Sequence, residues 1–347
     1  MEVSPENPAE NQLGAGVKEE DLLKAVAASG YPLQAVAVDL IASNLFSDQS
    51  VLEVQEEWSY IDEDTGEFRN LDAYISRQFD HIGRGHIRPH LTMLVECKKS
   101  ELPFVFFLRQ APCGDFPRLI GMPHQQLGLR FPGDATANGT GPITIGMHLS
   151  HVLGLSEVPF SLEPPRAIAM SKAVRKSGSI ELTGEETFRG IALPLMKAFK
   201  HFSRVCQPKP EHCYYDVRAV FPVAVVRAPM IGVQVIEGEP KMTALPWVRV
   251  VRVEPSTERF RSGYAELYAM DVVHEAYLEA YTKKVHAACQ EIFRRMELIS
   301  IPLITGIAVL GEGEAGSLQA PYESLRAHLT DDEFNAWMRE KLRATHG

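Results

Sequence analysis

Residues 91–107 read LTMLVECKKSELPFVFF, and this stretch decides how the rest of the chain is interpreted. Its two apolar runs predict two buried strands, at 90–98 and 103–109. The first run ends in Glu96, Lys98 and Lys99, although charged side chains are seldom buried unless they are paired. Because side chains alternate between the faces of a strand, Glu96 and Lys98 are expected on one face, near its end.

A hairpin is predicted just before this stretch. Residues 50–61 and 67–79 alternate as strands do, and 62–66, DEDTG, has turn chemistry with a glycine that accepts positive φ. In the second strand, alternation places Asp72 on the face of Asn70 and Tyr74, and Leu71 on the face of Ala73 and Ile75. If this strand neighbours 90–98, Asp72 and Glu96 converge, with Lys98 beside them.

Two neighbouring carboxylates repel each other unless a cation lies between them. Oxygen ligands with open coordination positions suit Mg²⁺ or Mn²⁺, and such an ion lowers the pKa of a bound water and offsets phosphoryl charge. The residues therefore predict Asp72 and Glu96 as metal ligands and as catalytic groups. Lys98 is predicted to orient the water, to help deprotonate it, or to stabilise the charge of the transition state.

The remaining sequence predicts an α/β sandwich with a mixed sheet. Helices are predicted at 18–29, 33–46, 183–205, 265–296 and 330–346, with Thr183–Glu186 as a capping box, Thr330 as an N-cap and a kink at Pro194. Further strands are expected on both sides of Pro229 within 214–236, and at 247–255. Residues 80–89 are expected to form a loop, and 110–176 to be the least regular part of the chain.

The segments RNLDAYI (69–75) and LTMLVECKKS (91–100) resemble the PD-(D/E)xK nuclease superfamily, whose signature is an Asp on one strand and Glu/Asp-x-Lys on the next. The resemblance covers roughly 18–109 well and 183–255 loosely. It implies a restriction-endonuclease-like mixed β-sheet flanked by helices, in one domain at 17–347 with an irregular insertion at about 110–176. It also implies metal-dependent hydrolysis of phosphodiester bonds, usually of DNA.

Two features depart from the family pattern. Leu71 replaces the proline of the family name. The further acidic residue that many members carry on the first helix has two candidates here, Glu20 or Glu19, and the strand 50–61 offers Glu57 and Glu53 as well.

Basic residues near the predicted site are candidates for phosphate contacts. Arg84 and Arg88 lie in the loop 80–90 with three histidines, and Lys99 follows the predicted catalytic lysine. A solvated loop explains the arginines equally well. A second basic patch, at 166–176, is better explained as a solvated face.

Composition limits the class of protein. The chain has 347 residues, is 45% hydrophobic and carries a net charge of −10. Residues 1–67 hold 15 acidic and 2 basic residues (−13), and the rest holds 30 and 33 (+3). Residues 1–16 are expected to be a disordered acidic tail without a secretory signal, and the five cysteines include no CxxC pair, as expected of a reduced cytoplasmic protein.

The resulting expectation is a bacterial, cytoplasmic endonuclease that uses Mg²⁺ or Mn²⁺ and acts on nucleic acid, with DNA favoured over RNA and no membrane partner. Its role would be in host defence or DNA repair, as a homodimer or with a protein partner. The alternative is a binding module with the same fold and a weak or inactive site, which acts through a protein or nucleic acid. A third reading is an unrelated α/β protein. No Walker, GxSxG or HExxH motif points to other hydrolytic chemistry.

Overall fold

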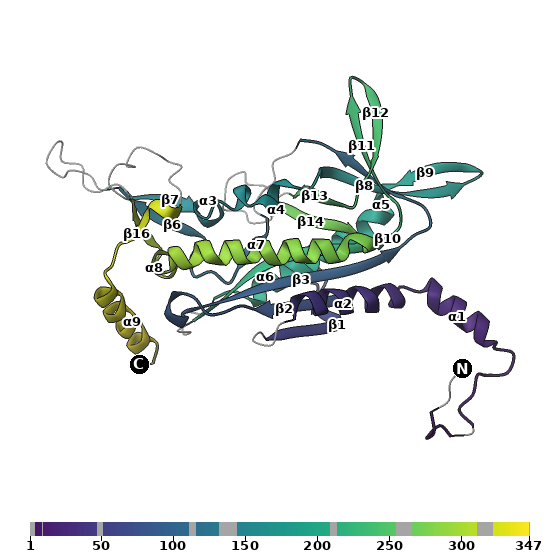
Figure 1. Cartoon of the computed structure of the whole chain (residues 1–347), viewed down its shortest axis with the longest axis horizontal. Helices are drawn as coiled ribbons and strands as arrows, with labels where there is room; N and C mark the ends of the chain where they lie inside the picture. The colour runs from purple at the N-terminus through teal and green to yellow at the C-terminus, as the bar shows by residue number, and fades with distance from the viewer. Residues whose placement is uncertain are drawn as a thin grey trace.

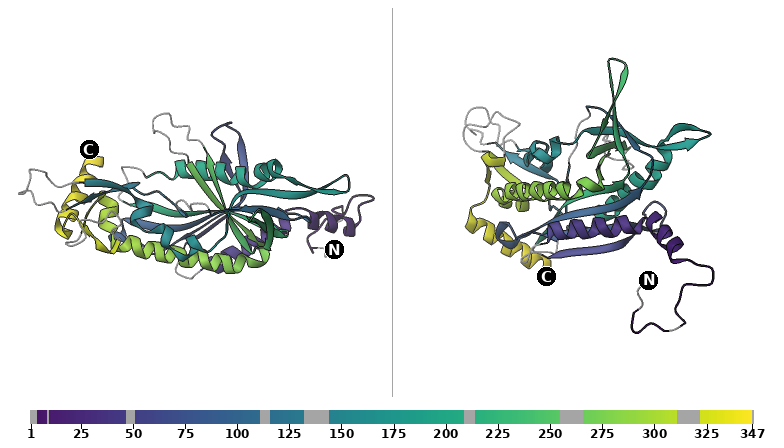
Figure 2. Two further views of the ribbon diagram at one scale, coloured as in Figure 1. Left: turned by 90° about the horizontal axis from the view of Figure 1, so that it is seen from above. Right: turned by 45° about the vertical axis from the view of Figure 1, so that its right-hand side comes forward.

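A mixed β-sheet forms the centre of the structure, a computed structural model that describes residues 4–8, 10–46, 51–110, 116–131, 144–208, 214–254, 266–310 and 322–346 (Figure 1). Within these residues the sheet has twelve strands, in the order β1-β2-β3-β10-β14-β13-β8-β4-β11-β12, with β5 paired to β10 and β9 to β8. Its strands cross at steep angles when seen from above, which is the usual twist of a large sheet (Figure 2).

The strands of this sheet are β1 (Leu52–Ile61), β2 (Phe68–Gln78), β3 (Ile87–Lys99), β4 (Phe104–Leu108), β5 (Arg118–Ile120), β8 (Arg166–Lys176), β9 (Ser179–Thr183), β10 (Tyr215–Arg227), β11 (Met230–Ile236), β12 (Glu239–Ala244), β13 (Trp247–Glu254) and β14 (Glu266–His274). A second, four-stranded sheet contains β6 (Gln126–Arg130), β7 (Thr144–His148), β15 (Ile307–Leu310) and β16 (Leu325–Ala327). The main helices are α1 (Glu19–Ala28), α2 (Tyr31–Leu45), α6 (Leu193–Val205), α7 (Leu278–Leu298) and α9 (Asp331–His346), and the short ones are α3 (Leu149–Val152), α4 (Pro159–Leu162), α5 (Gly184–Thr187) and α8 (Ser300–Thr305).

Helices cover both faces of the sheet, as predicted. Apolar side chains of α2 and α7 pack in one core cluster with Ala73, Ile75 and Val95. Those of α6 pack in the other, with Tyr74 and Leu94. The three strands β1, β2 and β3 are antiparallel, and β10 then lies parallel to β3. Burial on both faces explains why β3 and β10 read as nearly continuous apolar runs.

The predicted helix at 265–296 is wrong in its first third. Residues 266–274 form β14, in the middle of the sheet between β10 and β13, and the helix begins only at Leu278. The spacing of apolar residues in this segment fits a helix, but strand partners on both sides and the β-branched Val272 and Val273 favour the extended form.

Smaller differences concern element ends and caps. β3 begins at Ile87, inside the predicted loop. A π-helical turn at Phe188–Ala192 interrupts the predicted helix 183–205 just before Pro194. Thr183 makes no capping hydrogen bond to the backbone, whereas Thr330 and Glu333 do form a reciprocal capping box.

The segment 110–176 is more regular than its sequence suggests. It supplies β6 and β7 to the small sheet and β8 to the main one, where β8 lies between β13 and β4. Residues 111–115 and 132–143 lie outside the described residues.

Two hairpin arms extend from the body of the protein, β8–β9 and β11–β12 (Figures 1 and 2). Each turns through two residues of positive φ, Ser177–Gly178 in the first arm and Glu237–Gly238 in the second. Such turns match the right-handed twist of paired strands, so both arms are well-formed two-stranded ribbons.

No single helix of the described residues is both long and apolar enough to cross a membrane. Helices α1 and α2 meet the length and composition test only when taken together, and their axes are bent by 59°.

Candidate functional site

Asp72 and Glu96 lie opposite each other where β2 and β3 separate. The last registered pair of the two strands is Ala73 with Val95, so the next position places Asp72 opposite Glu96. Extending the register by one position brings the backbone of Asp72 across from that of Glu96, and Lys98 lies two residues farther along β3.

The backbone of the β1–β2 hairpin changes at this point. Glu57, which lies across from Asp72 between two registered pairs, has a φ of 49°, in the left-handed region. On β2, the regular alternation of side chains between the two faces breaks here. Leu71 packs in the same core cluster as Tyr74, and Ala73 packs in the cluster on the opposite face. The prediction that Leu71 and Ala73 share a face is wrong, because the strand twists at Asp72.

This twist turns the carboxylate of Asp72 towards the end of β3. The backbone N–H of Cys97 donates a hydrogen bond of 2.5 Å to Oδ2 of Asp72. Asp72 thus takes the place of a strand carbonyl as hydrogen-bond partner, which fixes its side chain next to the two residues of the Glu-x-Lys motif.

Gln34 of α2 holds the backbone of Asp72 in place. Its Nε2 donates to the backbone carbonyl of Asp72 at 3.1 Å and to Oε2 of Glu56 at 3.2 Å, and the residue is only 5% exposed. Sequence analysis missed this residue, although a glutamine on the apolar face of the predicted helix 33–46 was the available signal.

Glu96 and Lys98 form an ion pair at the site. Lys98 Nζ lies 2.5 Å from Oε1 of Glu96, whose side chain is 7% exposed, whereas that of Lys98 is 37% exposed. The carboxylate is therefore held inside the protein, and the ammonium group reaches the surface.

Burial dominates the electrostatics of this group. Burial, followed by repulsion from Asp72, raises the pKa of Glu96 to about 7. Burial likewise raises the pKa of Asp72, although the Cys97 hydrogen bond and Lys98 oppose the shift. Burial alone would lower the pKa of Lys98, but the Glu96 carboxylate outweighs it and the pKa is raised. Lys98 is thus protonated at neutral pH, and the negative charges of Asp72 and Glu96 are only partly neutralised by their surroundings.

Of the additional acids named above, Glu57 acts on both members of the pair. Its charge raises the pKa of both Asp72 and Glu96. Glu53 accepts a hydrogen bond from the hydroxyl of Tyr74 at 3.4 Å. Glu20 lies on α1, exposed and paired with Lys24.

The three candidate phosphate contacts are separated by the structure. Lys99 is exposed and donates to the carbonyl of Ala27, at the end of α1 near the site. Arg84 pairs with Asp331 and Arg88 makes a two-pronged ion pair with Asp216. Both arginines lie at the opposite end of β3, about 30 Å from Lys98 at the usual rise per strand residue.

The donor set fits a hard divalent cation in part. Among the described residues, no three His, Cys, Asp or Glu side chains come together as a ready-made metal site. The pair Asp72 and Glu96 offers two carboxylates whose charged forms are disfavoured where they stand. Mg²⁺ characteristically binds through one or two carboxylates together with waters and substrate phosphates, so a pair of carboxylates is compatible with that ion.

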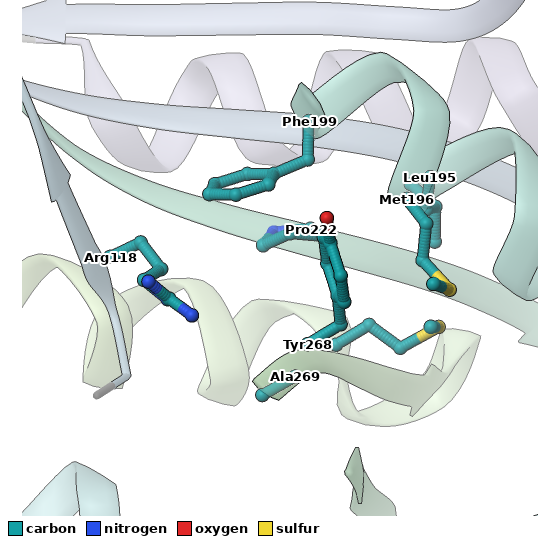
Figure 3. A pocket seen from close by; sticks show the side chains of 8 residues that line it. Arg118, Leu195, Met196, Phe199, Pro222, Tyr268 and Ala269 are labelled. Atoms are coloured by element: carbon teal, nitrogen blue, oxygen red, sulfur yellow. The ribbon is translucent and has the colours of Figure 1, made fainter. Parts of the chain in front are cut away.

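A pocket also lies between α6 and the sheet. Figure 3 shows Leu195, Met196 and Phe199 of α6 facing Pro222 of β10 and Tyr268 of β14, with Arg118 at one side. Its lining is apolar except for Arg118 and the Tyr268 hydroxyl, and it includes none of the residues of the candidate site.

Comparison with known proteins gives no relative. No family model matches the chain, no curated protein is similar to it in sequence, and no solved structure matches its fold.

Proposed function

We propose that the protein is a divalent-metal-dependent nuclease with the restriction-endonuclease-like fold. One observation carries the proposal: the Asp72 carboxylate accepts the backbone N–H of Cys97, between Glu96 and Lys98, and Lys98 Nζ lies 2.5 Å from Glu96. The fold assignment is supported by the antiparallel strands β1, β2 and β3 after α2, and by β10, which follows α6 and lies parallel to β3, with helices packed on both faces of the sheet.

Each residue has a distinct part in this proposal. Asp72 and Glu96 would hold Mg²⁺ or Mn²⁺, and the ion, when bound, supplies an activated water and offsets phosphate charge. Cys97 N–H and Gln34 keep Asp72 in position. Because its pKa is raised, Lys98 stays protonated at neutral pH, so it acts as a charged donor to the phosphoryl oxygens in preference to accepting a proton.

Cleavage of supercoiled DNA, linear duplex DNA, single-stranded DNA and RNA tests the proposal, each with Mg²⁺, Mn²⁺ or EDTA. We expect cutting that requires metal and falls at least about 100-fold in Asp72→Asn, Glu96→Gln and Lys98→Met, as is typical for loss of a charged catalytic group. The exposed α7 pair Glu279–Lys283 provides matched controls, Glu279→Gln and Lys283→Met, which should cut like the wild type.

A second candidate is a binding module with the same fold. It is favoured by the ion pair itself, since Lys98 neutralises Glu96 without a metal. Calorimetric titration with Mn²⁺ separates the two candidates. Binding that is lost in Asp72→Asn supports the nuclease, whereas a wild-type protein that neither binds Mn²⁺ nor cuts any substrate supports the binding module.

A further inference from the structure

The two hairpin arms of the protein differ in charge. Residues 172–183 of the β8–β9 arm hold Lys172, Arg175 and Lys176 against one acid, Glu181, a balance of +2. Residues 230–244 of the β11–β12 arm hold two acids and one lysine, a balance of −1. In a chain with a net charge of −10, a locally positive arm stands out as a candidate contact for an anionic partner.

The cations of the β8–β9 arm are available at the surface. Arg175 and Lys176 are exposed. An ion pair within the arm joins Lys176 to Glu181 at 3.5 Å, with both side chains about half exposed or more, so solvent screens it strongly. The arm thus keeps most of its positive charge for a partner.

The arm begins close to the candidate site. Lys172 pairs with Phe104, and Ala173 N–H donates to the carbonyl of Pro103 at 2.9 Å. Pro103 follows Lys98 by five residues, and Ala173 lies one strand spacing beyond it, so the base of the arm lies within about 22 Å of Lys98. Both views place the arm at the end of the protein where α1 lies, and α1 contacts Lys99 (Figures 1 and 2).

The ribbon has cations on both of its faces. Arg175 pairs across the hairpin with Ile180, and Lys176 pairs with Ser179, so the two cations point to opposite faces. A two-stranded ribbon fits the major groove of B-form DNA, about 12 Å wide, where phosphates line both walls. The major groove of A-form RNA is too narrow for it.

We propose that the β8–β9 arm binds duplex DNA, with its ribbon in the major groove and Arg175 and Lys176 on the phosphates of the two strands. This inference rests on the proposed nuclease function and names its substrate. Adding the chain from Lys98 to Pro103, one strand spacing and the chain from Ala173 to Gly178, the tip of the arm lies at most about 39 Å from Lys98, which corresponds to about eleven base pairs of duplex. The arm would hold the duplex beside the site where it is cut.

The test measures binding in EDTA, so that cleavage does not interfere. Fluorescence anisotropy with a labelled 24-base-pair DNA duplex gives Kd between 50 and 300 mM KCl for the wild type and for the double variant Arg175→Gln/Lys176→Gln. Loss of two phosphate contacts should make the slope of log Kd against log salt shallower by about 1.8, and should weaken binding at least tenfold at low salt. The matched control Lys241→Gln, on the other arm, should leave both quantities unchanged.

The same titration with a 24-base-pair RNA duplex tests the groove argument. We expect the arm substitutions to change RNA binding much less than DNA binding. Equal losses on RNA and DNA, an unchanged salt slope in the arm variant, or no binding of duplex DNA by the wild type would each overturn the proposal. Cleavage by the wild type and by Asp72→Asn is measured in parallel. Metal-dependent cutting, together with an unchanged salt slope in the arm variant, would refute the role of the arm and leave the proposed nuclease function standing.

Discussion

Two buried groups on β3 should make the stability of the protein respond to pH in opposite directions. Burial, followed by repulsion from Asp72, raises the pKa of Glu96 from 4.5 to about 7. Burial, followed by the charge of Arg218, lowers the pKa of His90 from 6.5 to about 4. Glu96 is 5% exposed and His90 is 9% exposed, so solvent screens neither shift strongly.

The sign of each contribution follows from which state binds more protons. Between pH 4.5 and 7 folded Glu96 keeps its proton and the unfolded chain loses it, so stability falls as pH rises. Between pH 4 and 6.5 the unfolded chain protonates His90 and the folded protein does not, so stability rises with pH. A pKa that differs by about 2.5 between the folded and unfolded protein corresponds to about 3 kcal/mol, and the two contributions should nearly cancel in the wild type.

Single substitutions should separate the two opposing contributions to the pH dependence of stability. We expect the free energy of unfolding of Glu96→Gln, relative to the wild type, to increase by about 3 kcal/mol between pH 4.5 and 7.5. His90→Gln should show a relative decrease of similar size over the same range. Urea unfolding in EDTA at four pH values measures both changes, and comparing slopes against pH removes the constant cost of lost contacts.

The double variant provides the control. Glu96→Gln/His90→Gln should be as flat as the wild type, since the two sites lie six residues apart on one strand and titrate independently. If the free energy of unfolding of Glu96→Gln ran parallel to that of the wild type across this pH range, the pKa of Glu96 would not be raised. The conclusion that the charges of the two acids are only partly neutralised would then also fail.

Two further predictions concern ion pairs away from the site. Asp62 is 1% exposed and pairs with Arg69 and Lys197. Burial alone would raise the pKa of Asp62, but these two partners outweigh burial and lower it. Asp62→Asn should therefore lose about 2 kcal/mol of stability at pH 7, measured by urea unfolding, and this loss should shrink only as the pH falls below 3.8. Asp271→Asn should cost about 3 to 5 kcal/mol because it removes the negative charge that balances the fully buried Arg249. The double change Arg249→Met/Asp271→Leu should recover most of that loss in the same assay, and an equally unstable double variant would contradict the reasoning.

The sequence determined the β1–β2–β3 part of the fold and the position of the candidate site. Alternation of side chains located β1, β2 and β3, and turn chemistry at 62–66 joined the first two strands. Local pattern is sufficient here because consecutive antiparallel strands pair with their neighbours in sequence. The spacing of Glu96 and Lys98 then placed both at one strand end without knowledge of the rest of the chain.

Only the tertiary structure decided where β14 and β8 go. Each has a partner that is distant in the sequence: β14 pairs with β10, and β8 pairs with β4 and β13. An apolar segment with a strand on either side gains backbone pairing in the extended form, whatever its local helical spacing. The same reason applies to Asp72: its carboxylate meets Cys97 N–H because β1 and β2 twist together at Glu57, a change of direction that no residue pattern encodes. Alternation fixes the face of a side chain within a regular strand, and its final direction depends on how neighbouring strands pack.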